Sequence, residues 1–509
     1  MNQKTRGAIA AGHHLTVAAG QEMFNLGGNA FDAAIAAILA SFVVESTLTS
    51  AAGGGFFLAH TQEKQNILFD FFPNTPLKKR PLDELNFYPV ELNFGGELQT
   101  FHIGLGSMAI PSNIAGIFAV HKKLGKLPFQ IVAEPAIEYA KNGFIINNYQ
   151  SFCLKLLAPI LQAFPATRQV YAPDGELLTA GQTCYMPDFA ATLTYLVEQG
   201  VGEFYQGEIA HQLVKDCQEK GGYLTKKDLT KYEVFVRKPL KINYRGYELV
   251  TNPPPSSGGI LIAFALKLIE KIELGKIQFG SGEHLQILVE VMQLTNLARK
   301  NSYDSCVYEA DITEKFLAQE IVGQYQEQLN KWGSTTQISV LDSEGNAASV
   351  TTSNGEGSSY MIPGTGIMVN NMLGEADLNP FGFHQWKCNQ RISSMMSPTI
   401  VLKEGKPEIV LGSGGSNRIR TAILQVISNI IDFQMPLTIA VQSPRVHWEN
   451  NVFSVEPTLA AINKLVLPPA TKVVLWKEKN MFFGGVNAVT EKEAVGDERR
   501  EGAGEKIGK

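Results

Sequence analysis

The clearest alternation of apolar and polar positions in the chain lies at residues 337–340. The alternation has the period of two that is typical of a half-buried strand. The polar, glycine-containing run 342–346 predicts a turn, and residues 347–352 predict the returning strand. We therefore expect a β-hairpin with a hydroxyl residue, Thr335, at its mouth.

Helical patterns dominate before residue 330, and strand patterns dominate just after it. The alanine-rich segment 30–40 has small residues on every face, which is typical of a helix buried against close neighbours. The other predicted helices are 111–143 (interrupted at 125–128), most of 150–235, 260–269, 283–330 and 418–431. The predicted strands are 56–58 after a glycine run, 240–251, and most of 335–415. No polar linker separates the two halves, so we expect one interdigitated domain.

Composition is that of an ordinary globular protein. Of its 509 residues, 44% are hydrophobic and 18% charged, and the net charge is −5 with a pI near 6.1. These values give no electrostatic case for a nucleic-acid partner or an anionic membrane. The longest uncharged apolar run near the start, 33–44, is shorter than the roughly 20 residues that span a bilayer. The first residues lack the apolar core of a secretory signal, so we expect a cytoplasmic protein.

The cysteines and histidines predict no metal site. Five cysteines lie far apart without C-x-x-C spacing, and the nine histidines form no ligand pattern. Neither a disulfide framework nor a zinc site is indicated, and no cofactor motif is present.

A threonine at the mouth of a hairpin has one chemical use, which is autocatalytic cleavage of the chain. A hydroxyl that follows a flexible Gly333–Ser334 pair can attack the peptide bond before it and so cut the chain. The new N-terminal residue then carries its own base, the α-amine. The alternative from these residues alone is an ordinary hairpin that begins with a threonine.

The run 335–340, with Gly345, Asn346 and Ala347 after it, resembles the maturation site of the γ-glutamyltransferase family. That site usually reads Thr-Thr/Ala-His-hydrophobic-Ser-Val. Further blocks follow in the family's order: residues 28–34, 204–210, 244–247, 253–259, 364–371, 393–400, 412–416, 483–489 and 496–500. The resemblance covers nearly the whole chain.

This resemblance implies an α+β fold of the N-terminal nucleophile hydrolase type, a four-layer αββα sandwich. It also implies a precursor that cuts itself between Ser334 and Thr335. Residues 1–334 would then form a helix-rich large subunit and residues 335–509 a strand-rich small subunit, which stay together as one unit.

The resemblance assigns the catalytic roles as follows. Thr335 is the nucleophile and its freed α-amine the general base. The amides of Gly414 and Gly415 bind the oxyanion, although the spacing also allows Ser416 one of these places. Ser353, eighteen residues after the nucleophile, supplies a second hydroxyl that bonds to it.

The same resemblance assigns the substrate-binding roles. Ser393 and Ser394 hold the donor's α-carboxylate, but an ungapped count gives Ser394 and Met395 instead. The acidic residue for the α-amine is Glu375 by direct count, or Asp377 if the loop is longer. The expected asparagine position is occupied by Gly355, with Asn354 adjacent.

Three further positions depart from the family. Phe72 replaces the arginine that grips the α-carboxylate, and phenylalanine cannot replace an Arg–carboxylate fork. Gln337 replaces the histidine after the two threonines, and Met372 replaces a glutamine or glutamate. The bond-breaking residues are thus retained while half of the glutamyl clamp is lost.

Three functions are compatible with this pattern. The first is a γ-glutamyl amidohydrolase or acyltransferase that passes the acyl group from a small donor to water or an amine. The second is a related amidohydrolase with another acyl donor, similar to cephalosporin acylases. The third is a catalytically silent scaffold, against which the retained Thr335, Ser353 and glycine pair argue.

Overall fold

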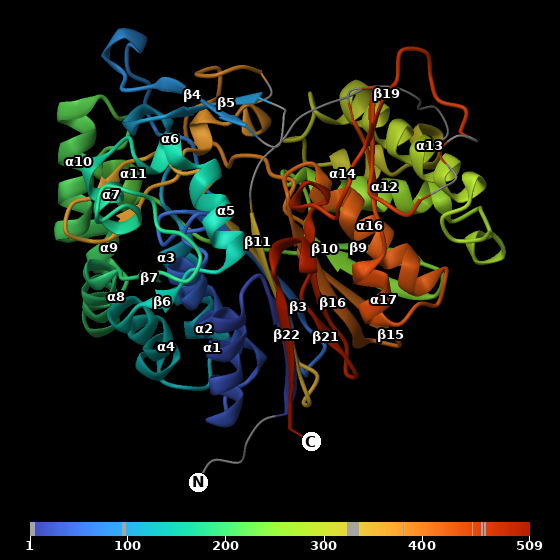
Figure 1. Cartoon of the computed structure of the whole chain (residues 1–509), viewed down its shortest axis with the longest axis horizontal. Helices are drawn as coiled ribbons and strands as arrows, with labels where there is room; N and C mark the ends of the chain where they lie inside the picture. Colours follow the sequence, from blue (N-terminus) through green and yellow to red (C-terminus); the bar gives the residue numbers. More distant parts are fainter. Residues whose placement is uncertain are drawn as a thin grey trace.

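The computed structural model describes residues 6–93, 98–322, 335–379, 381–449, 451–459, 462 and 465–508. Gly333 and Ser334 lie outside the described residues. In the described part of the chain two large β-sheets stack on each other, and a helical layer covers the outer face of each (Figure 1). The fold is therefore an α+β, four-layer αββα sandwich, as predicted.

Each sheet draws strands from distant parts of the chain. The first has the order β22 (Ala503–Ile507), β1 (Gly7–Ala11), β11 (Thr336–Asp342), β12 (Ala347–Ser353), β2 (Gly54–His60), β3 (Asn66–Phe71) and β8 (Phe235–Arg237). The second has the order β21 (Ala494–Val495), β20 (Gly485–Val489), β16 (Lys406–Gly414), β15 (Thr399–Lys403), β10 (Tyr247–Thr251) and β9 (Leu240–Tyr244). Each sheet thus combines strands from before and after residue 335.

The helices form two separate layers. Against the first sheet lie α1 (His14–Asn25), α2 (Ala30–Val44) and α3 (Asn113–Leu124), with α4 (Phe129–Asn142), α5 (Asn148–Leu156), α6 (Ala158–Leu161), α7 (Pro165–Tyr171), α8 (Pro187–Gln199), α9 (Gly202–Gln206), α10 (Glu208–Lys220) and α11 (Lys226–Thr230) around them. Against the second sheet lie α12 (Ser257–Ile269), α16 (Arg418–Ile431) and α17 (Leu437–Gln442), next to α13 (Gly282–Ala298), α14 (Ile312–Phe316) and α15 (Gln319–Val322).

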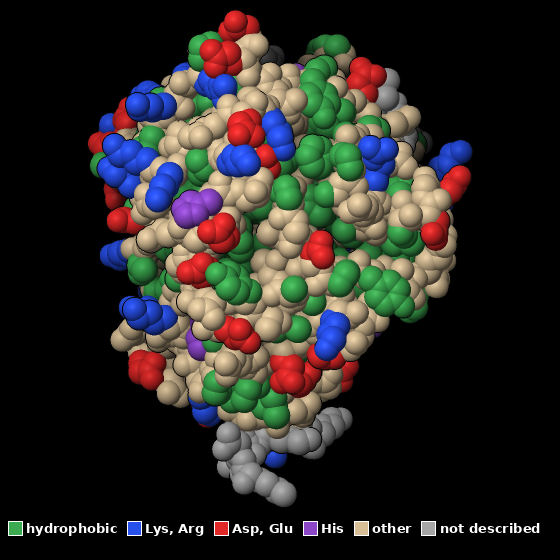
Figure 2. Space-filling model, turned by 90° about the vertical axis from the view of Figure 1, so that its left-hand side faces the viewer, with side chains coloured by type: hydrophobic (Ala, Val, Ile, Leu, Met, Phe, Trp, Pro, Cys, Tyr) green, Lys and Arg blue, Asp and Glu red, His purple; other side chains and the backbone are tan. Residues whose placement is uncertain are grey.

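Short strand pairs complete the described elements. They are β4 (Tyr88–Asn93) with β5 (Leu98–Ile103), β6 (Phe144–Ile145) with β7 (Thr183–Cys184), β13 (Met361–Ile362) with β14 (Ile367–Met368), and β17 (Val446–Glu449) with β18 (Val452–Val455) and β19 (Lys472–Leu475). No helix among the described residues is long and apolar enough to cross a membrane. On the face shown in Figure 2, cationic and anionic side chains are interspersed.

Helix α2 shows how the sequence forms the first core. Asn29 and Asp32 form a reciprocal capping box at its start, since each side chain accepts a hydrogen bond from the other's backbone amide. Every residue of the helix is buried, because its small side chains allow neighbours to approach on all sides. The predicted buried helix at 30–40 is confirmed, and it continues to Val44.

The predicted hairpin is also confirmed. Strands β11 and β12 pair antiparallel, with Thr336 opposite Thr352 and Leu341 opposite Ala347. Both strands are buried along their whole length, because the helical layer covers one face and the second sheet covers the other. The hairpin is therefore the central element of the sandwich.

Gln337 joins the two sheets through hydrogen bonds. Its side-chain oxygen accepts from Thr351 Oγ1 at 2.6 Å, and its Nε2 donates to Ser349 Oγ at 3.0 Å. Asn487 of the second sheet donates to the Gln337 carbonyl at 2.7 Å. A Cβ on Gly412 would lie 2.2 Å from Gln337 Oε1, so glycine there makes room for the amide. Gln337 therefore supplies hydrogen-bond partners to buried hydroxyl groups close to the start of the hairpin.

Two predicted segments differ from the structure. Most of 354–398 is irregular rather than strand, because a series of glycines there, including Gly355, Gly357, Gly364 and Gly366, has positive φ, which a continuous strand does not accommodate. The predicted helical segment 283–330 is helical but interrupted, since α13 ends at Ala298, a π-helical turn covers Arg299–Tyr303, and the short helices α14 and α15 follow. The last part of that prediction, 323–330, lies outside the described residues.

Candidate active site

Thr335 lies at the open end of the central hairpin. It directly precedes β11 and is 4% exposed. Since Thr336 pairs with Thr352, continuing the register by one residue places Thr335 opposite Ser353. Both residues line one cavity, and Ser353 Oγ also accepts a hydrogen bond from the Gly355 amide at 2.9 Å. The hairpin thus brings the two predicted hydroxyl residues together.

The backbone of Thr335 is held from behind. Arg500 donates from Nη1 to the Thr335 carbonyl oxygen at 2.9 Å. A Cβ on Gly414 would lie only 1.9 Å from that same oxygen, so only glycine fits at this position of β16. The carbonyl group of Thr335 is therefore held by Arg500 and by its close contact with Gly414.

A buried carboxylate lies on the far side of Thr336. Glu45 accepts hydrogen bonds from Thr336 Oγ1 at 2.5 Å and from Thr16 Oγ1 at 2.7 Å. Burial raises the pKa of the Glu45 carboxyl, and the two hydroxyl donors and the charge of Arg500 oppose that rise. Glu45, Arg500 and Gly414 line a small second cavity behind Thr335.

The glycine pair forms a tight strand-to-helix turn. Gly414 is the last residue of β16 and pairs with Gly485, and Gly415 has φ of +118°. Ser416 follows with φ of +51°, and helix α16 begins at Arg418. Ser416 lines the main cavity, whereas Gly414 lines the cavity behind Thr335. The strand end at Gly414 therefore contacts Thr335, and the expected oxyanion role of the Gly414 and Gly415 amides stays a prediction.

Both candidate serines line the main cavity. Ser393 Oγ is 3.1 Å from Ser257 Oγ and donates to the Pro255 carbonyl at 2.7 Å. Ser394 Oγ accepts from the Met396 amide at 3.1 Å. Met395, the alternative from the ungapped count, lines the cavity as well.

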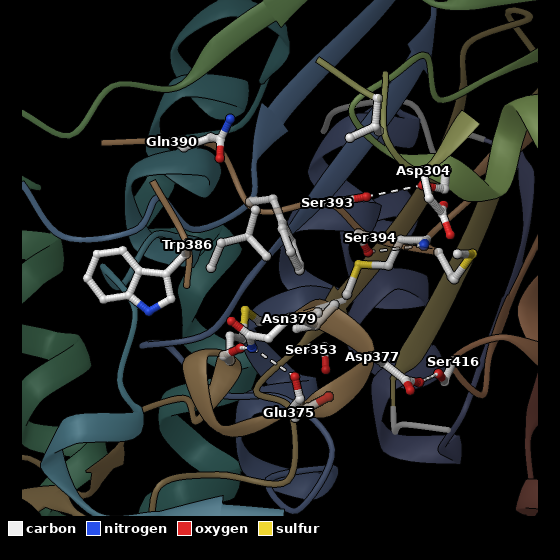
Figure 3. A pocket seen from close by; sticks show the side chains of 18 of the residues that line it. Asp304, Ser353, Glu375, Asp377, Asn379, Trp386, Gln390, Ser393, Ser394 and Ser416 are labelled. Carbon is white, nitrogen blue, oxygen red and sulfur yellow. Dashed lines mark hydrogen bonds between the residues drawn. The ribbon is translucent and has the colours of Figure 1, made fainter. Parts of the chain in front are cut away.

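The two acidic candidates lie together on the cavity wall. Figure 3 shows Asp377 facing Ser416, whose hydroxyl donates to it, with Glu375 on the same side of the pocket. Burial raises the pKa of Asp377 to about 7, although the Ser416 hydrogen bond opposes the rise. Burial and the nearby charges of Glu356 and Asp377 raise the pKa of Glu375 well above its usual value. An ammonium ion placed here would relieve both penalties.

Asn354 is not brought to the cavity. Its side-chain oxygen accepts from Ser50 Oγ at 2.8 Å, its residue is fully buried, and it is absent from the described residues that line the pocket. The positive φ of Gly355 turns the chain at this point. The substrate-binding role expected for Asn354 is therefore left without a contact in this structure.

The position of the missing arginine is apolar. Phe72 lines the cavity, is 1% exposed, and stacks on Phe56 with ring centroids 5.4 Å apart. Other apolar lining residues are Val307, Met372, Leu378, Phe381, Met395, Met396 and Ile419. Much of the cavity wall thus suits the hydrocarbon part of an acyl group.

Several residues of this site were not predicted from the sequence. The motif 496–500 contained Arg500, but nothing in its pattern indicated a contact with Thr335. Arg299 and Asp304 also line the cavity, and no periodicity signalled them, since Arg299 begins a π-helical turn and Asp304 directly follows it. Among the described residues no group of three or more His, Cys, Asp or Glu side chains could hold a metal ion.

Comparisons with known proteins agree with this geometry. The profile of the family described as gamma-glutamyltranspeptidase matches residues 16–507. The chain is 30% identical over 504 residues to the acylase ACY 1 proenzyme of Pseudomonas sp. strain SE83, covering 95% of this chain and 90% of the relative. It is 32% identical over 485 residues to the glutathione hydrolase proenzyme of Escherichia coli K12, covering 87% and 81%.

Two solved structures are similar to the whole or part of the chain. The cephalosporin acylase of Bacillus halodurans superimposes with a TM-score of 0.85 at 24% identity, covering 99% of this chain and 96% of that one. The γ-glutamyltranspeptidase of Helicobacter pylori gives a TM-score of 0.55 at 29% identity, covering 63% and 91%. The first of these likenesses bears on the fold alone.

Proposed function

The chain belongs to the gamma-glutamyltranspeptidase family, and from this premise we propose that it cuts itself before Thr335 and then uses Thr335 to cleave γ-glutamyl amide bonds. The cut divides the precursor into residues 1–334 and 335–509. The observation that carries the proposal is that Thr335 and Ser353 lie side by side on the wall of the cavity that also holds the paired serines and the two acids.

The reaction follows from the position of Thr335. Its hydroxyl oxygen bonds to the donor's carbonyl carbon, while its proton passes through water to the α-amine of Thr335. Amides of the Gly414–Gly415 turn stabilise the oxyanion, the C–N bond breaks, and the ammonium returns the proton to the leaving nitrogen. Water or an amine then attacks the Thr335 ester and restores the free hydroxyl.

The α-ammonium and the α-carboxylate of the donor would face two different walls of the cavity. Glu375 and Asp377 are placed to receive an α-ammonium, since both carry a penalty for their buried charge. Among the described residues the Ser394 hydroxyl only accepts a hydrogen bond, from the Met396 amide, so its O–H is placed to donate to a carboxylate. The Ser393 hydroxyl donates to the Pro255 carbonyl and takes the same role only when it releases that oxygen. The partners are thus a small acyl-amide donor and the two pieces of the same precursor, and a cytoplasmic location stays a prediction.

A second candidate differs only in the acyl group. Phe72 and the three methionines on the cavity wall favour a donor with a larger apolar part, and one relative is named an acylase. In that case Thr335 performs the same chemistry on an amide that lacks the full γ-glutamyl group.

The test that separates these donors is a panel of p-nitroanilides. We expect the purified enzyme to release p-nitroaniline from the γ-glutamyl anilide faster than from simple acyl anilides. A wild-type preference for acyl anilides without an amino acid end would favour the second candidate, and no turnover of any anilide would contradict both.

The pKa of Asp377 predicts a pH-dependent donor preference. Because that pKa is raised to about 7, the carboxyl is charged above pH 7 and neutral below it. A donor that carries an α-ammonium therefore loses a partner as the pH falls from 8 to 6. Glutaryl p-nitroanilide, which lacks the amine, is the reference donor. We expect the kcat/KM of the γ-glutamyl anilide, divided by the kcat/KM of the glutaryl anilide, to fall about threefold to tenfold over this range.

Dividing one kcat/KM by the other removes the effect of protonating the Thr335 amine, because that protonation slows both donors equally. In Asp377→Asn the ratio should be low and nearly independent of pH. A wild-type ratio that stays constant between pH 6 and 8 would contradict the assigned role of Asp377.

A further inference from the structure

Arg299 is the one lysine or arginine among the described residues that line the main cavity. Its side chain is 14% exposed, so its charge is largely withdrawn from water. Asp304, Glu375 and Asp377 line the same cavity as acids. A partly buried guanidinium in a cavity that serine hydroxyls also line suits an anionic group on a ligand.

A change in helix geometry places Arg299 there. Helix α13 ends at Ala298, and the chain continues as a π-helical turn over Arg299–Tyr303 before Asp304. A π-turn inserts an extra residue and rotates the following side chains relative to an α-helix, and such turns are frequent at functional sites. The turn is what carries both Arg299 and Asp304 to the cavity wall.

The guanidinium of Arg299 is held by two hydrogen bonds, and not all of its N–H donors take part in them. Its Nε donates to Asp304 Oδ1 at 3.0 Å, and its Nη1 donates to Asn417 Oδ1 at 3.3 Å. Within the described part of the chain, Nη2 makes no hydrogen bond. The pKa of Arg299 is raised chiefly by the Asp304 charge against the opposing effect of burial, so the group stays cationic. A fixed cation with free donors is pre-organised for a carboxylate.

Hydroxyl groups line the wall next to it. Figure 3 shows Asp304 and Ser393 on the side of the pocket away from Glu375 and Asp377. Ser257, which also lines the cavity, lies 3.1 Å from Ser393 through its hydroxyl. Arg299 is bonded to Asp304 at this wall, while its Nη1 donates to Asn417, which follows the Ser416 that binds Asp377. The guanidinium therefore lies between the serine wall and the acidic wall.

We propose that Arg299 receives the carboxylate of the acyl donor, the contact that Phe72 cannot make. The inference rests on the proposed function and adds a residue to its donor-binding site. The donor is an amide of a dicarboxylic acid, whose free carboxylate binds Arg299 and the serine hydroxyls while its other end reaches Thr335.

The test compares two donors that differ at one group. They are γ-glutamyl p-nitroanilide and its analogue in which the α-carboxylate is a carboxamide. In Arg299→Gln we expect kcat/KM for the carboxylate donor to fall about 10- to 100-fold, mainly through KM, because a hydrogen bond to a charged group is lost. The carboxamide donor should change less than about threefold, and Arg299→Lys should recover part of the loss.

A matched control removes another arginine–aspartate pair. Arg245 pairs with Asp432, is 26% exposed at its side chain, and does not line the cavity. Arg245→Gln should leave the ratio of the two donors unchanged. If Arg299→Gln slows both donors equally, or if it behaves as Arg245→Gln does, Arg299 is structural and the proposal is wrong.

A binding measurement separates this proposal from the proposed function. By calorimetry, L-glutamate should bind the wild-type protein at least tenfold more tightly than it binds Arg299→Gln, and isoglutamine, its α-amide, should bind both weakly. This result would support the carboxylate site even if neither anilide were turned over. Equal glutamate affinity in both proteins, or no glutamate binding to the wild type, would overturn it.

Discussion

Thr335→Ala should give a chain that stays whole and turns over no donor. The substitution removes the hydroxyl that attacks the preceding peptide bond, so the α-amine that serves as the base never forms. Nucleophile and base are lost together, and activity should fall by at least about 10³-fold. Denaturing gel electrophoresis and the anilide assay, run beside the wild type, measure both effects.

Thr335→Ser is the matched control for this change. It keeps the hydroxyl and removes only a methyl group, so cutting and turnover should persist at a reduced rate. Thr335 is only 4% exposed, and both substitutions should therefore be checked for an unchanged far-UV spectrum. A Thr335→Ala protein that is still cut, or still active, would show that another residue is the nucleophile.

Gly414→Ala should be nearly as damaging without touching a reactive group. The new methyl carbon would lie 1.9 Å from the Thr335 carbonyl oxygen and 2.8 Å from Arg500 Nη1, both far inside van der Waals contact. The nucleophile must shift or the strand must open, and the amides of the turn move with it. We expect kcat/KM to fall about 10²- to 10³-fold, as for loss of an oxyanion donor.

The control for that variant is Gly202→Ala at the start of α9. A Cβ there would meet nothing within 4 Å, so folding and activity should match those of the wild type. Thermal melts separate a local effect from unfolding, since a folded but inactive Gly414→Ala is the expected outcome. Wild-type activity in Gly414→Ala would contradict the close contact between this strand and Thr335.

The parts of the fold that follow local rules were predictable from the sequence. Alternation at 337–340 and the turn at 342–346 determined the hairpin, and the small residues of 30–40 indicated a helix buried on all sides. The irregular path of 354–398 was not predictable, because it depends on positive φ at separated glycines such as Gly364. Apolar residues between those glycines looked like strands.

The placement of Thr335 next to Ser353 was predictable, because their separation in the sequence fits the register of the hairpin. Eighteen residues separate Thr335 and Ser353, and the hairpin register places them opposite each other. The serine pair and the acidic pair carried ambiguities of one or two residues, and the structure places all four on the cavity wall. Asn354 directly follows Ser353 at the end of β12, and its side chain bonds Ser50 instead of lining the cavity.

Residues that reach the site from afar had no signal in the sequence. Arg500 contacts Thr335 across 165 positions of the chain, and Arg299 reaches the cavity through an unpredicted π-turn. Long-range contacts of this kind depend on how the layers pack, and local patterns do not encode them one at a time.

Intact mass spectrometry of the purified wild-type protein, with N-terminal sequencing of its smaller fragment, determines whether and where the chain is cut. We expect two fragments that remain together under native conditions, the smaller beginning at Thr335 and running to Lys509. A single uncut chain of 55.7 kDa, or a smaller fragment beginning at any other residue, would contradict this expectation.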